Sequence, residues 1–144
     1  MRKLFLSIVV VSIFSFTTKA QTDLKTMQDI QTVLTYYLDG ATNGDSIMFS
    51  KAFHPDGQMR FMRNDTVMNI VLKDFMARMR NTGNKTDRKT KIENIQVFGN
   101  AASAKLTIEY PTFYFHDIMS LLKTKEGWKI VGKIFYREEK APVK

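Results

Sequence analysis

Cysteine is absent from the 144 residues of the chain. Without it the protein forms no disulfide, so side-chain packing has to supply its stability, and no thiol is available for lipid attachment. Histidine is nearly as scarce, with only His54 and His116. Because a zinc site usually uses three or four His, Cys or carboxylate ligands, we predict no metal site and no cofactor.

Several motifs of well-known chemistry are also missing. No serine stands in a nucleophile elbow, and no glycine-rich phosphate loop is present. After the first twenty residues there is no apolar run long enough to cross a membrane, which takes about 20 residues. We therefore expect neither a phosphate loop enzyme nor a membrane anchor.

One apolar run does stand at the start, LFLSIVVVSIFSF from Leu4 to Phe16. It follows the basic MRK and precedes TTKAQ, which puts Thr18 and Ala20 at the small positions before a cleavage site. This pattern predicts a signal peptide over residues 1–20 rather than a buried N-terminal strand. Cleavage after Ala20 would leave a single domain, residues 21–144, exported to a bacterial periplasm or the medium.

The net charge of +8 falls to +5 without the leader, which carries Arg2, Lys3 and Lys19. The densest basic stretch, residues 78–91, is RMRNTGNKTDRKTK; it contains turn residues and no aromatic side chain that could stack on a base. A solvated loop is favoured over a nucleic-acid site, because no binding motif accompanies the charge.

The first half of the mature chain shows helical periodicity. A first helix is predicted from an N-cap at Thr22 to the TNGD turn, and a second, SIMFSKAF, is capped by Asp45 and stopped before Pro55. Two extended runs then flank Asn64 and Asp65, which is typical of a hairpin. A third helix, LKDFMARMR, follows.

The second half is extended. Four runs, KIENIQVFG, AASAKLTIEYP, TFYFHDIMSLLKTK and GWKIVGKIFYRE, are separated by turn residues and predict an antiparallel meander. The second run alternates apolar and polar residues, whereas the third is apolar on both faces and should be central and covered on both sides. The predicted fold class is α+β, a curved antiparallel sheet covered by about three helices.

At this point the residues resemble a family. The succession YYLDGATNGD, AFHPDGQM, FGNAASAKL, FHDIMSLLK and GWKIVGKIF, from about Leu24 to Phe135, is similar to the nuclear transport factor 2-like superfamily. Within it the chain most resembles the bacterial family named putative lumazine-binding, near the SnoaL-like and ketosteroid isomerase-like proteins. The resemblance implies a cone-shaped sheet around a cavity, and a superfold that hosts both enzymes and non-catalytic binding domains.

The two histidines stand in different settings. His54 follows a predicted helix end, where the helix dipole would favour an imidazolium. Asp56 and Gly57 are residue types that favour turns. FHPDG is therefore interpreted first as a structural joint between a helix and a strand. His116 and Asp117 are neighbours on a strand and point to opposite faces. Asp117 should share a face with Phe113, Phe115, Met119 and Leu121. His116 should lie on the opposite face. Each face then carries one ionisable group among apolar residues, a candidate for function.

Our leading hypothesis is an exported domain that binds a small apolar or aromatic molecule in the cone. The expected pocket residues are Tyr37, Phe53, His54, Phe61, Phe75, Asp117 and Trp128. A homodimer through the outer face of the sheet is expected, with no nucleic-acid partner. One alternative is an enzyme of isomerase, dehydratase or cyclase type, with Asp117 or His54 as general base and Tyr37 as hydrogen-bond donor. The other is a structural or partner-binding module whose cone is filled by its own side chains.

Overall fold

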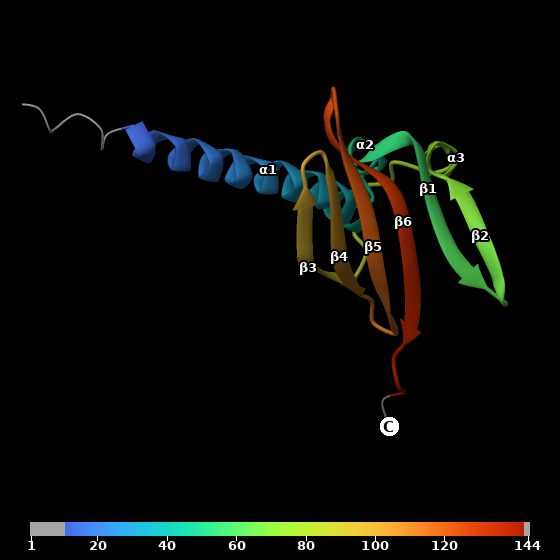
Figure 1. The fold of residues 1–144 in the computed structure, drawn as a ribbon. Coiled ribbons are helices and arrows are strands. Elements are labelled where there is room, and N and C mark those ends of the chain that lie inside the picture. The colour runs from blue at the N-terminus through green and yellow to red at the C-terminus, as the bar shows by residue number, and fades with distance from the viewer. Residues whose placement is uncertain (1–10, 143–144) are drawn as a thin grey trace, which may run out of the picture.

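The computed structural model describes residues 11–142. The first half of the predicted signal peptide therefore lies outside the described residues. Three helices and six strands follow one another along the chain (Figure 1). They are α1 (Val11–Thr42), α2 (Ser46–Lys51), β1 (Phe53–Arg63), β2 (Thr66–Val71), α3 (Leu72–Ala77), β3 (Lys89–Phe98), β4 (Ala101–Glu109), β5 (Phe113–Thr124) and β6 (Gly127–Glu139). The predicted α+β class and the four-strand meander are confirmed.

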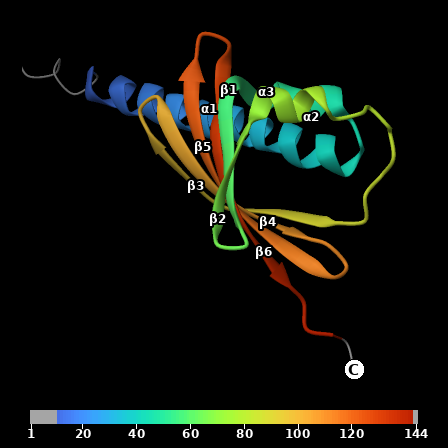
Figure 2. The ribbon, with the colours of Figure 1, turned by 90° about the vertical axis from the view of Figure 1, so that its right-hand side faces the viewer.

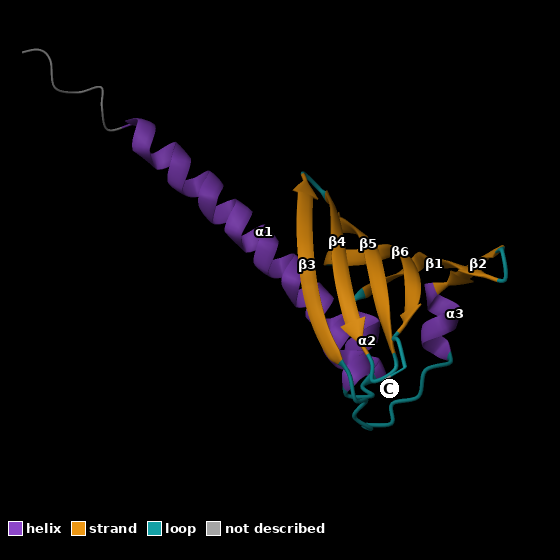
Figure 3. Ribbon diagram, turned by 90° about the horizontal axis from the view of Figure 1, so that it is seen from below, coloured by secondary structure: helices purple, strands orange, loops and turns teal. Residues whose placement is uncertain are grey.

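The sheet has the strand order β2-β1-β6-β5-β4-β3. Every neighbouring pair is antiparallel except β1 and β6, which run parallel. The prediction of an antiparallel sheet therefore needs this one correction, because β1, besides pairing with β2, runs alongside the last strand of the meander in the same direction. The sheet curves under the three helices, which lie on one side of it (Figure 2). The first part of α1 extends past the edge strand β3 (Figure 3).

The first helix begins earlier than the sequence predicted. It runs continuously from Val11, so Thr22 lies inside a helix and is not its N-cap. Its end agrees with the prediction: Gly44 adopts a positive φ of 63°, and the Asp45 carboxylate accepts a hydrogen bond from Met48 N at 2.8 Å to cap α2. No helix among residues 11–142 has the length and apolar character of a membrane span.

The second helix is shorter than predicted. It ends at Lys51, and Phe53 already belongs to β1, so His54 stands in a strand and not at a helix end. The dipole argument for an imidazolium at His54 was therefore wrong. Asp56 N instead donates to His54 Nδ1 at 3.2 Å, within an irregular stretch of β1 between Phe53 and Gln58. The interpretation of FHPDG as a structural joint is supported by this contact.

The hairpin and the two faces of β5 agree with the sequence pattern. Asn64 and Asp65 both have positive φ, as the tight turn between β1 and β2 requires. Asp117, Met119 and Leu121 are buried on the inner face of β5. On its outer face, however, Ile118 and Leu122 are 49% and 44% exposed. The prediction that β5 is covered on both sides is thus wrong for a single chain.

Candidate functional site

A cavity of about 270 Å³ lies between the helices and the inner face of the sheet. Its wall is mostly aromatic and aliphatic, and its polar groups come from Tyr37, Arg88, Tyr110 and Lys133. The other lining residues are Ala41, Phe49, Phe53, Met59, Leu72, Phe75, Met79, Ile108, Phe115 and Phe135. Concave, mostly apolar walls with a few converging polar groups are typical of small-molecule sites.

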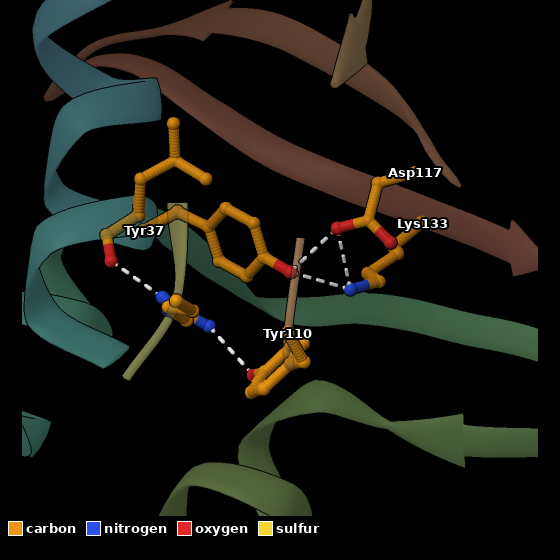
Figure 4. A network of polar contacts seen from close by, with 6 residues as sticks. Tyr37, Tyr110, Asp117 and Lys133 are labelled. Atoms are coloured by element: carbon orange, nitrogen blue, oxygen red, sulfur yellow. Dashed lines mark hydrogen bonds and ion pairs between the residues drawn. The ribbon is translucent and has the colours of Figure 1, made fainter. Parts of the chain in front are cut away.

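Three buried polar side chains form a closed triangle at this wall (Figure 4). The Tyr37 hydroxyl donates to Asp117 Oδ2 at 2.6 Å. Lys133 Nζ donates to the same Oδ2 at 2.8 Å and to Tyr37 Oη at 2.5 Å. The three residues come from α1, β5 and β6, so the triangle links the helix layer to the sheet.

An irregularity in β6 places Lys133 in the triangle. The pairing of β5 with β6 shifts between Ser120 and Leu121, where Leu121 pairs with Ile130 but Ser120 pairs with Gly132. The extra residue, Val131, reverses the alternation of β6, because side chains on a regular strand change face at every residue. Lys133 consequently points inward, diagonally opposite Asp117.

Burial governs the electrostatics of the triangle. Asp117 is 0% and Lys133 9% exposed. Burial lowers the pKa of Lys133, and the ion pair with Asp117 opposes that shift. Burial, with the adjacent Asp117 carboxylate, raises the pKa of Tyr37 well above its usual value of 10.0. Tyr37 is therefore a neutral hydrogen-bond donor at neutral pH.

Aromatic rings surround the Lys133 ammonium. Nζ lies 4.8 Å from the centroid of the Tyr37 ring, 5.0 Å from that of Phe135 and 6.0 Å from that of Phe115. The faces of aromatic rings attract cations, most strongly where water is excluded. These contacts favour a charged Lys133 at the cavity wall.

One oxygen of the triangle has no partner. Asp117 Oδ1 is buried, and no group among the described residues donates a hydrogen bond to it. An unsatisfied buried acceptor is costly.

Arg88 is fixed at another part of the same wall. Its Nε donates to Thr42 Oγ1 at 2.8 Å, Nη2 to Leu38 O at 2.5 Å and Nη1 to Tyr110 Oη at 3.0 Å. These contacts connect the segment before β3 to the end of α1. Arg88 is thereby held rigidly with its charge at the cavity.

The structure brings together some of the residues expected from the sequence and separates others. Tyr37, Phe53 and Phe75 line the cavity, and Asp117 binds Tyr37 directly. Phe61 stacks on the lining residue Phe135, with ring centroids 4.8 Å apart. Asp117 and Phe61 are not themselves lining residues of this cavity, and both border the groove on the outer face. His54 and Trp128 line neither space. Trp128 is buried in the core, and its Nε1 has no acceptor among the described residues.

The second histidine belongs to the outer face. His116 Nε2 lies 2.7 Å from Glu138 Oε2, far from the inner surface on which its neighbour Asp117 lies. Within residues 11–142 no three His, Cys, Asp or Glu side chains gather in a way that could hold a metal ion.

Sequence reasoning missed Lys133 and Arg88. Regular alternation from Trp128 and Ile130 would place Lys133 on the outer face, and only the bulge reverses it. Gly132, in the interior of β6 and next to Lys133, was the available signal, because glycine inside a strand often marks a bulge. Arg88 belongs to the basic stretch for which the sequence predicts a solvated loop. No feature of the neighbouring sequence distinguishes it from the lysines beside it.

Solved structures of low sequence identity share this fold. A protein of Shewanella baltica OS155, described as NTF2-like and of unknown function, is 24% identical with a TM-score of 0.71, covering 80% of this chain and 95% of that one. An NTF2-like protein of unknown function from Silicibacter pomeroyi DSS-3 is 17% identical with a TM-score of 0.69, covering 81% and 98%.

A third solved structure, an NTF2-like protein of unknown function from Methylobacillus flagellatus KT, is 29% identical with a TM-score of 0.67, covering 78% of this chain and 91% of that one. No curated protein matches the sequence. Residues 25–136 match the family described as "Putative lumazine-binding". The match spans both helix layer and sheet, and the chain therefore belongs to that family, with the nuclear transport factor 2-like fold.

Proposed function

We propose that the chain is a binding domain for a small, largely apolar or aromatic molecule that occupies the cavity between α1 and the sheet. The observation that carries the proposal is the wall itself: a 270 Å³ space lined by aromatic side chains, with the Tyr37, Asp117 and Lys133 triangle at one place in it. Apolar walls supply affinity, and a few fixed polar groups supply orientation. A cone filled by its own side chains would lack such a space.

The alternative hypothesis, an enzyme with a general base that moves a proton, has less support from the structure than the binding function. Asp117, the base of that hypothesis, has Oδ2 occupied by two donors, one of them the Lys133 ammonium, and is not among the lining residues of the cavity. A general base needs to lie within hydrogen-bond reach of the proton that it removes. His54, the other base considered, does not line the cavity.

Export to a bacterial periplasm or the medium is part of the same proposal, since the leader pattern of residues 1–20 supports it. Expression of the full chain in a Gram-negative host tests this point. Cleavage after Ala20 predicts a periplasmic protein that begins at Gln21, identified by its intact mass. A protein that retains residues 1–20 would contradict it.

Native mass spectrometry tests the binding function. Ala41 lines the cavity from α1, whereas Gln31 is exposed on the same helix. Ala41→Phe should fill the cavity, and Gln31→Phe should add the same ring outside it. We expect the wild type and Gln31→Phe to retain a co-purified or added small molecule, with lumazine among the probes because the family description names it.

The comparison of Ala41→Phe with Gln31→Phe shows whether the cavity is the binding site. Loss of binding in Ala41→Phe alone, with both variants folded by circular dichroism, would support the cavity as the site. Equal binding by the two variants would place any ligand elsewhere, and would contradict the proposal.

A further inference from the structure

The charges at the cavity are not balanced. Its wall contains two cationic side chains, Arg88 and Lys133, and no acidic one. In the part of the chain that the structure describes, the one carboxylate that forms an ion pair with either of them is that of Asp117, which pairs with Lys133 at 2.8 Å. With Tyr37 neutral, Asp117 compensates a single positive charge, and the other remains.

The uncompensated cation is Arg88. Its three hydrogen bonds go to the Thr42 hydroxyl, the Leu38 carbonyl and the Tyr110 hydroxyl, all of which are neutral acceptors. Within residues 11–142 no carboxylate forms an ion pair with it. A guanidinium carries five N–H donors in a fixed plane, so donors remain after these three bonds.

Such an arrangement suits an anion. Attraction between opposite charges strengthens as water is excluded and the effective dielectric constant falls, and Arg88 is half-buried. A guanidinium held in place before the ligand arrives has no further ordering cost, and charge-assisted hydrogen bonds to carboxylates are short and strong. The surrounding rings of Phe49, Phe53 and Phe75 offer an apolar surface for the rest of the molecule.

We propose that the ligand of this cavity is a compact aromatic or alicyclic carboxylate, whose anionic group is received by Arg88 and Lys133 and whose ring system contacts the phenylalanine wall. This proposal rests on the proposed binding function and adds the charge and size of the ligand. The volume of about 270 Å³ lies just below the range of drug-sized ligand sites, roughly 300–1,000 Å³. It therefore suits one or two rings rather than a polycyclic molecule.

A pair of probes with the same shape and different charge tests the proposal. They are 2-naphthoate and its neutral amide, 2-naphthamide, titrated into the intact protein by isothermal calorimetry. We expect 2-naphthoate to bind about tenfold to a hundredfold more tightly, as the gain from a hydrogen bond to a charged group implies. Arg88→Gln should remove most of this preference, and Arg88→Lys, which retains the cation, should keep part of it.

The outcomes separate the two proposals. Equal affinity for the two probes, in a wild type that binds both, would overturn the carboxylate inference and leave the binding function standing. Binding of neither probe at millimolar concentration would count against both. Should Arg88→Gln fail to fold, the comparison of the two probes on the wild type decides the matter without it.

Discussion

Lys133 Nζ and Asp117 Oδ2 lie 2.8 Å apart, and both side chains are buried against the aromatic wall of the cavity. A buried ion pair of this kind contributes little net stability compared with apolar residues of similar size, but removal of one partner leaves an uncompensated charge. The pair therefore constrains which substitutions the site can tolerate.

The stability losses of the two single substitutions of this pair should add up to more than the loss of the double variant. Lys133→Met leaves the Asp117 carboxylate buried without a cation, and should lower the free energy of unfolding by about 3–5 kcal/mol. In the double variant Asp117→Asn with Lys133→Met, no charge remains to be compensated. Urea unfolding should be measured for the wild type, Lys133→Met, Asp117→Asn and the double variant. The double variant should lose clearly less unfolding free energy than the two single variants lose together. Additive losses would mean that the two side chains do not interact.

The Tyr37 phenol should remain protonated in alkali. Because its folded pKa lies above the usual 10.0, the protonated phenol contributes stability that is fully present below pH 10.0 and is lost as the pH rises through the folded pKa. Above pH 10.0 the wild type should thus lose stability more steeply than Tyr37→Phe. Lys133 loses its hydrogen bond to the Tyr37 hydroxyl in this variant, so phenolate absorbance is followed as well, because it reports Tyr37 alone. Parallel stability curves, or an early phenolate absorbance that Tyr37→Phe removes, would contradict a buried neutral phenol.

The contact of α1 with α2 should not tolerate a methyl group at Gly40. A Cβ there would stand 2.5 Å from Phe49 N and 2.7 Å from Phe49 Cα, which are backbone atoms that cannot turn away. Gly40→Ala should lower the unfolding free energy by at least about 1–3 kcal/mol, the usual cost of overpacking. Gly132→Ala is the control, because its Cβ would meet Ser120 Cβ at an ordinary 3.5 Å. Thermal melts that rank the two variants the other way would refute the close approach.

The outer face of the sheet leads us to propose a homodimer. Ile118, Ile134 and Tyr136 are 49%, 51% and 67% exposed and line a groove there. Basic Arg60 and Lys105 and acidic Glu138 lie on the same face, exposed, so a twofold-related copy could place opposite charges against each other around an apolar centre.

Sedimentation velocity should find a dimer at micromolar concentration for the wild type. Ile134→Glu should dissociate the dimer. Ile47→Glu should not, because Ile47 is also largely exposed, at 62%, but lies on α2. A monomeric wild type, or a dimer that is indifferent to Ile134→Glu, would exclude this face as the interface.

Periodicity predicted the elements well, because it reports local preferences that the fold does not override. The alternation in β5 correctly placed Asp117 and His116 on opposite faces, and the structure puts Asp117 on the inner one. The turn at Asn64 and Asp65, and the cap at Asp45, were likewise readable from residue type.

Only part of the candidate site could be predicted from the sequence, because the rest depends on contacts between residues far apart in the chain. Tyr37 and Asp117 were singled out from the sequence because each is a polar group on an apolar face, and the structure joins them by a hydrogen bond. Lys133 was missed because a single inserted residue in β6 reverses the face of everything after it. Arg88 was missed because its role depends on acceptors from residues 38, 42 and 110, which no local pattern connects to it.

Methionine methyl groups provide the most direct test of the central claim, that the cavity beneath α1 binds a small molecule. Met59 and Met79 line the cavity, whereas Met62 lies in the outer groove. In a protein labelled at the methionine methyl carbons, titration with 2-naphthoate should shift the NMR signals of Met59 and Met79 in a saturable way and leave that of Met62 in place. A shift of Met62 with no change at Met59 and Met79 would contradict the claim.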